Sequence, residues 1–135
     1  MLSLPDALQR AIQLLALPQT EHATAHRVRR LDAPGAYFLV CVPGHVAVID
    51  DESGELLTSA RSTNPPGLLT QEEARRQAGL GTDADAELVW KPCAASQSMF
   101  DPIWAVSSSG RTKYVDQRGR VWNDLQPKRP GGGFG

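Results

Sequence analysis

The apolar residues follow a helical period in two short segments of the chain. The first segment carries one apolar stripe, at Leu4, Ala7, Leu8, Ala11, Ile12 and Leu15. Ser3 is a residue type favoured at N-caps, and Pro18 ends the stripe. The second segment opens on the capping box Thr70-Gln71-Glu72-Glu73 and closes at Gly79. We therefore expect one helix after Ser3 and another after Thr70.

Shorter segments rich in β-branched and aromatic residues predict strands between and after these helices. They are residues 37–42, 46–50, 55–59, 103–107, 113–116 and 120–122. Residues 21–31 and 86–91 can supply one additional strand in each half of the chain. Short turn sequences such as Pro43-Gly44 join successive strands and favour antiparallel pairing. The pattern predicts an α+β fold.

The two halves of the chain repeat the same pattern. The matched pairs, about 66 residues apart, are Phe38 and Trp104, Val40 and Val106, Gly44 and Gly110, Ile49 and Val115, and Asp50 and Asp116. The caps Ser3 and Thr70 also correspond. We predict two α-β-meander repeats, residues 1–66 and 67–126, with their helices packed on one side of the sheet or sheets. A flexible Pro/Gly-rich tail is expected over residues 127–135.

The meander resembles the PepSY domain. The hairpin formed by residues 46–50 and 53–57, with Asp50 before the turn and Gly54 within it, is similar to that family's strand-turn-strand motif. Thr70-Gln71-Glu72-Glu73-Ala74 is similar to its capped helix. The resemblance implies a binding or inhibitory role without catalytic residues. Members of that family are mostly exported, whereas Met1–Asp6 has neither the basic region nor the long apolar segment of a secretory signal, so we expect a cytoplasmic protein.

Composition narrows the classes of partner. The 135 residues include 14 Lys+Arg and 15 Asp+Glu, a net charge of -1, which argues against bulk electrostatic attraction to nucleic acid or anionic lipid. No apolar stretch approaches the roughly 20 residues of a membrane span, so we expect no membrane insertion. The hydrophobic fraction of 41% is that of an ordinary globular chain.

The candidate chemistry is sparse. The two cysteines, Cys41 and Cys93, and the three histidines have no paired spacing of a metal site, so neither a metal nor a cofactor is expected. Cys41 falls in an expected strand and is interpreted as a core residue. Cys93 has no histidine at a recognisable spacing, and it is the residue on which an enzymatic alternative depends. Asp50 and Asp116 both begin turns and are interpreted as structural.

The largest difference between the two halves is the long link of residues 92–102, which is bracketed by prolines. Long loops anchored on a sheet often carry function. The expected partner-binding residues in and around this link, with one aromatic residue of the tail, are Trp90, Cys93, Ser96, Gln97, Ser98, Met99, Phe100, Trp104 and Phe134. Met99 and Phe100 are the anchors, because flexible and aromatic side chains dominate binding hot spots.

These observations favour a small non-enzymatic protein-binding module, with the role of an inhibitor or accessory protein of a larger partner. Two alternatives stay open. One is a thiol-dependent enzyme or redox protein that uses Cys93. The other is an immunity protein that neutralises a toxin, a class of similar size and fold.

Overall fold

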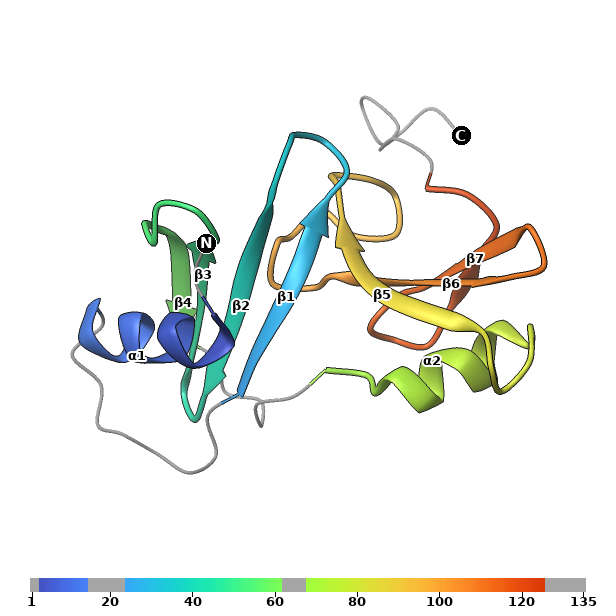
Figure 1. The fold of residues 1–135 in the computed structure, drawn as a ribbon, viewed down its shortest axis with the longest axis horizontal. Coiled ribbons are helices and arrows are strands. Elements are labelled where there is room, and N and C mark those ends of the chain that lie inside the picture. Colours follow the sequence, from blue (N-terminus) through green and yellow to red (C-terminus); the bar gives the residue numbers. More distant parts are fainter. Residues whose placement is uncertain (1–2, 15–23, 62–67, 126–135) are drawn as a thin grey trace. The chain divides into compact units, whose positions relative to one another are not determined.

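The chain divides into two compact units, residues 1–68 and 69–135, in the computed structural model, which describes residues 3–14, 24–61 and 68–125 (Figure 1). The division falls between Leu68 and Leu69, slightly after the boundary expected from the repeat. The tail of residues 127–135, including Phe134, lies outside the described residues. None of the described helices is long and apolar enough to cross a membrane.

The first unit is a helix packed on an antiparallel sheet. Its elements are α1 (Leu4–Leu14), β1 (Thr24–Arg30), β2 (Ala36–Val42), β3 (His45–Asp50) and β4 (Leu56–Arg61), and its strands lie in the order β4-β3-β2-β1. Each strand pairs antiparallel with the next one along the chain. Ala7 and Ala11 of α1 are buried against Phe38, Val40 and Ile49 of the sheet. Because alanine is small, the helix axis can approach the strands closely.

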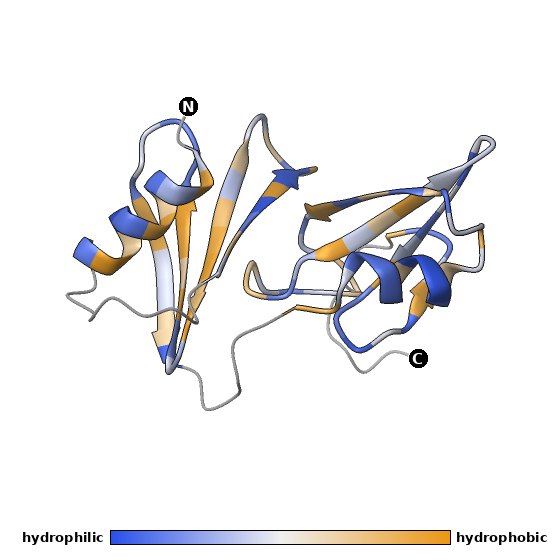
Figure 2. Cartoon of the chain, turned by 60° about the horizontal axis from the view of Figure 1, so that its bottom comes forward, coloured by the Kyte–Doolittle hydropathy of each residue, from blue (hydrophilic) through white to orange (hydrophobic). Residues whose placement is uncertain are grey.

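The second unit has the same order of elements. They are α2 (Gln71–Ala78), β5 (Asp85–Trp90), β6 (Ile103–Ser108), β7 (Arg111–Val115) and β8 (Val121–Trp122), with antiparallel neighbours in the order β5-β6-β7-β8. Ala74 and Ala78 of α2 are buried against Val106 and Val115. Figure 2 shows α2 mainly in the colour of hydrophilic residues, as expected of a helix that buries only its alanines.

Both expected helix starts are confirmed by their caps. The hydroxyl of Ser3 accepts the backbone N–H of Asp6 at 3.2 Å, and that of Thr70 accepts the N–H of Glu73 at 3.1 Å. The Thr70 hydroxyl also donates to the Glu73 carboxylate at 3.1 Å. Gly79 ends α2 with a φ of 68°, in the left-handed region where glycine has no Cβ penalty.

The α+β class and the antiparallel pairing are therefore confirmed in each unit. Phe38 and Trp104 both lie in the second strand of their unit. Phe38 is buried, whereas Trp104 is half-buried and donates its indole N–H to the carbonyl of Leu69 at 2.7 Å. Two finer expectations stay predictions: that the units are repeats of each other, and that both helices pack on one side of the sheet or sheets.

One buried polar atom of the first unit stands out. His26 in β1 is half-buried, and within the described ranges its Nε2 atom has no hydrogen-bond partner. Burial lowers the pKa of His26 from its ordinary value of 6.5, because the protonated ring loses hydration inside the fold. The folded unit therefore favours the neutral imidazole.

This lowered pKa predicts that acidification destabilises the protein. As pH falls through 6.5, the unfolded chain binds a proton at His26 before the folded chain does, so stability falls until the folded pKa is passed. The measurement is the free energy of unfolding in urea between about pH 7.5 and about pH 5.5. His26→Gln should flatten the decline, and an equal decline in wild type and variant would contradict the assignment.

Candidate binding site

The base of the loop between β5 and β6 belongs to the hydrophobic core of the second unit. Cys93 is fully buried and packs with Val89, Ile103 and Leu125 on one face of the sheet. Cys93 and Ser96 exchange two backbone hydrogen bonds, of 3.0 and 3.1 Å, and form a tight turn. The loop therefore covers a sheet face that would otherwise meet water.

The middle of the loop is held by its own serines. The Ser96 hydroxyl donates to the carbonyl of Ser98 at 3.0 Å. The Ser98 hydroxyl accepts the N–H of Phe100 at 3.1 Å, and the Ser98 carbonyl accepts the N–H of Asp101 at 3.0 Å. These bonds satisfy backbone groups without a helix or a strand. The loop thus has a defined shape before any partner binds.

The turn between β7 and β8 is built around the carboxylate of Asp116, which is only 5% exposed. Its Oδ1 accepts the backbone N–H groups of Arg118 at 2.9 Å and Arg120 at 3.0 Å. Its Oδ2 accepts the indole N–H of Trp122 at 3.0 Å, and the guanidinium of Arg120 lies 5.6 Å from the centre of that indole ring. These contacts support the structural interpretation of Asp116.

Asp50 performs the same task in the first unit. Its Oδ2 accepts the backbone N–H of Ser53 at 2.8 Å, the Ser53 hydroxyl at 2.9 Å and the N–H of Glu52 at 3.2 Å. Hydrogen bonds from the Ser53 backbone and then from its hydroxyl lower the pKa of Asp50, because they favour the charged carboxylate. The matching pattern of Asp50 and Asp116 thus has a shared physical cause in turn formation.

Gln117 ties the turn to the loop and to the segment before α2. Its Oε1 accepts the N–H of Leu69 at 2.7 Å, and its Nε2 donates to the carbonyl of Pro102 at 2.8 Å. One side chain therefore bridges backbone groups that are far apart in the sequence. Nothing in the sequence pattern singled out Gln117, because its partners meet only in the folded unit.

A polar pocket of about 480 Å³ lies between the loop and the turn. It is lined by Ala94, Ala95, Ser96, Gln97, Ser98, Asp101, Asp116, Gln117 and Arg118. Asp101 and Arg118, both exposed, contribute one negative and one positive side chain. Gln97 is also exposed and has both donors and acceptors. The third charged residue of the lining, Asp116, is buried, and its carboxylate already accepts three hydrogen bonds. This lining suits a neutral, hydrogen-bonding group such as a peptide main chain.

The expected site residues fall into four groups, which are buried, exposed, half-buried and outside the described residues. Trp90, Cys93 and Ser96 are buried, so they support the loop. Gln97 is exposed, and Ser98, Met99, Phe100 and Trp104 are half-buried. Phe134 lies outside the described residues. The pocket joins Ser96, Gln97 and Ser98 with six residues that were not among the expected site residues, namely Ala94, Ala95, Asp101, Asp116, Gln117 and Arg118.

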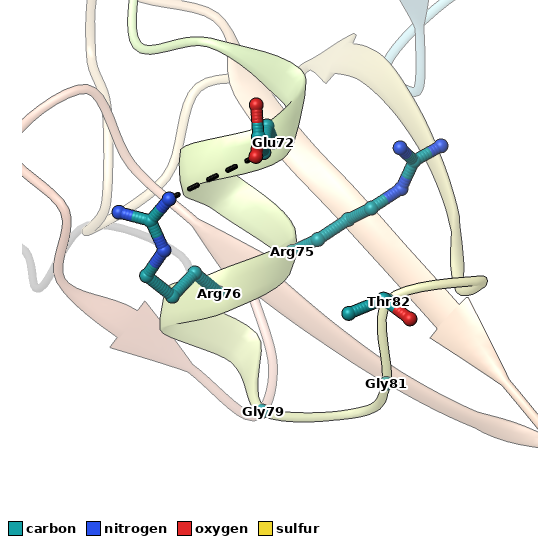
Figure 3. A pocket seen from close by; sticks show the side chains of 6 residues that line it. All are labelled: Glu72, Arg75, Arg76, Gly79, Gly81 and Thr82. Carbon is teal, nitrogen blue, oxygen red and sulfur yellow. Dashed lines mark ion pairs between the residues drawn. The ribbon is translucent and has the colours of Figure 1, made fainter.

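A second hollow of about 500 Å³ borders α2 and the turn after it (Figure 3). Glu72 and Arg76 lie on one side of the helix with 3.9 Å between their charged atoms, and Arg75 extends from the other side. Arg75 donates its Nε–H to the carbonyl of Ala84 at 2.7 Å. The Glu72–Arg76 contact therefore lies along the helix, and the Arg75 bond connects the helix to the segment that follows it.

Within the described ranges, no three His, Cys, Asp or Glu residues gather as a metal site would require.

Comparisons with protein-family models, curated proteins and solved structures found no match to this chain. The resemblance to the PepSY domain therefore stays a prediction from the hairpin around Asp50 and the capped helix after Thr70. The candidate site rests on the geometry of the second unit alone.

Asp116 offers a direct test of how the pocket wall is built. Asp116→Ala should destabilise the protein by about 2–3 kcal/mol, because three donors lose a carboxylate partner. Asp116→Asn should cost less, about 1 kcal/mol, since its amide oxygen can still serve the two backbone N–H groups. Urea unfolding of the three proteins measures the order, and equal stabilities would contradict it.

Proposed function

We propose that the chain is a small non-enzymatic protein-binding module and that residues 93–100, in the loop of residues 92–102, form its main binding surface together with Trp90 and Trp104 at the base of the loop. The observation that carries the proposal is the polar pocket beside this loop, combined with half-buried Met99 and Phe100 in the same loop. Partially exposed apolar side chains next to hydrogen-bonding groups are typical of a protein interface. The role of an inhibitor or accessory protein, in a cytoplasmic setting, is part of this proposal.

The contacts within the loop support this function physically. The hydrogen bonds of Ser96 and Ser98 fix the backbone that presents Met99 and Phe100. A surface that is already ordered loses less conformational entropy when a partner binds. Gln117 adds a second attachment through the carbonyl of Pro102. The pocket lining can then pair with the main chain of the partner next to the two apolar anchors.

The experiment that tests this function compares two variants. A partner is first captured from the native host on the full chain, and its dissociation constant is measured. Met99→Ala/Phe100→Ala should weaken binding by about 1–3 kcal/mol, because both anchors are truncated. Since both side chains are half-buried, the same variant should also lose about 1–2 kcal/mol of stability.

Ile103→Val is the matched control. Ile103 is fully buried beneath the loop, so its truncation should cost a similar amount of stability, about 1 kcal/mol, without altering the loop surface. Its affinity for the partner should equal that of the wild type. If the double variant also binds with unchanged affinity, the loop is a core plug and the proposed surface is wrong.

The environment of Cys93 weighs against the thiol-dependent alternative. The thiol is fully buried in the core of the second unit, and its Sγ lies 3.6 Å from the carbonyl oxygen of Ser96, to which it donates. A reactive thiol normally lies in an accessible, electropositive environment. Cys93 instead packs among Val89, Ile103 and Leu125.

We accordingly expect Cys93 to react slowly in the folded protein. In a Cys41→Ala variant, which leaves Cys93 as the single thiol, a thiol reagent should modify the native chain at least ~100-fold more slowly than the chain in urea. Rapid modification at neutral pH would favour the enzymatic alternative. Cys93→Ser should retain partner binding if the thiol has no chemical role.

We also propose that the two units are copies of one architecture, with corresponding helices on one side of their sheets. Three parallels support this proposal. Each unit has a capped helix followed by four antiparallel strands. Each buries two alanines of that helix against its sheet. Each closes its last hairpin with an aspartate, Asp50 or Asp116.

A further inference from the structure

The strand β4 forms one edge of the sheet in the first unit. It lies beside β3 at the end of the strand order, as Figure 1 illustrates. Four of its six residues are exposed, including Leu57 with 40% of its surface accessible. Within the described residues, β3 is the strand with which β4 pairs. The opposite edge of β4 therefore presents main-chain groups to solvent.

The pairing with β3 identifies which main-chain groups face outward. The N–H of Asp50 donates to the carbonyl of Glu55, so the main-chain groups of Asp50 face β4. Every second residue of β3, counted back from Asp50, therefore also faces β4. By this alternation Val48 bonds with its register partner Thr58. The N–H and C=O groups of Ser59, the next residue, then point away from the sheet. Leu57 lies at the register shift opposite Val48 and Ile49.

Before Arg61, the sequence of β4 lacks the charges and prolines that commonly protect a sheet edge, and the register shift beside Leu57 is the irregularity that this edge does have. Between Glu55 and Arg61 the residues are Leu56, Leu57, Thr58, Ser59 and Ala60, with no charge and no proline. Natural edges are commonly blunted by charges, prolines or very short strands. The terminal strand of the second unit, β8, follows the rule because it has only two residues, Val121 and Trp122. The neutral edge of β4 is thus suited to pairing.

We propose that β4 pairs antiparallel with β4 of a second copy of this chain, around a two-fold axis at Thr58. Opposite charges stand at its two ends, since Glu55 immediately precedes the strand and Arg61 is its last residue. Antiparallel pairing brings the Glu55 end of one copy to the Arg61 end of the other, twice in the symmetric dimer. This charge complementarity favours a second copy over an unrelated strand.

The centre of the pairing is also self-complementary. Thr58 meets Thr58 of the second copy as a non-hydrogen-bonded pair, in which side chains approach most closely. The outward groups of Ser59 then face Leu57 of the other copy. The interface goes beyond the proposed partner-binding function and does not depend on it, because β4 belongs to the first unit and the candidate loop to the second.

The first test removes one outward main-chain donor. Sedimentation velocity over a concentration series should show a monomer–dimer equilibrium for the full-length wild type. Ser59→Pro should weaken dimerisation at least tenfold, because proline has no N–H and the missing group faces away from β3. Ser59→Ala keeps the N–H and should dimerise as the wild type does. Unfolding in urea confirms that both variants are folded.

The second test uses charge and does not depend on a proline. Arg61→Glu should weaken the dimer up to about tenfold, since like charges then meet at both ends. Adding Glu55→Arg should restore it, because the opposite charges are exchanged. A wild type that stays monomeric overturns the proposal, as does a dimer unaffected by Ser59→Pro or not restored in the double variant.

Discussion

The last hairpin of each unit depends on one aspartate that gathers main-chain N–H groups of the following turn. Asp50 does so between β3 and β4, and Asp116 between β7 and β8. A carboxylate is suited to this position because charge-assisted hydrogen bonds are stronger than neutral ones. In the second unit the same carboxylate also holds the indole of Trp122, and the turn that it forms carries Gln117 to the loop. The carboxylate of Asp116 therefore holds the turn and the last strand together, and it also lines the pocket.

The loop of the second unit combines a structural role with a surface role. Cys93 and Pro102 are buried at its base, while Gln97 and Asp101 are exposed in its middle. A loop attached to the core at both ends can keep a fixed shape although it has little regular structure. Because both ends of the loop are buried, the candidate surface is confined to the few residues between Cys93 and Pro102. The rigidity of the site comes from the same contacts that complete the core.

The strand orders of the two units end in different ways at their last strands, β4 and β8. In the second unit β8 has two residues and is flanked by Arg120 and Asp124, so it offers little for another strand to extend. In the first unit β4 continues to Arg61 with a neutral centre. Similar folds can therefore present different surfaces, a polar loop pocket in one unit and an open main-chain edge in the other. These different surfaces follow from local sequence differences between two units that share the same order of elements.

The sequence by itself determined both helices and the meander strands of the two units, because their signals are local, and left β1 and β5 as optional additional strands. The caps Ser3 and Thr70 and the segments of β-branched and aromatic residues between short turns act over a few positions. Only the tertiary structure decided which loop residues are buried and what forms the pocket. Cys93 was expected in a binding surface but completes the core, and Gln117 joins Leu69 to Pro102 across long separations in the chain. Such contacts leave no periodic signal, because they depend on how strands and loops come together in space.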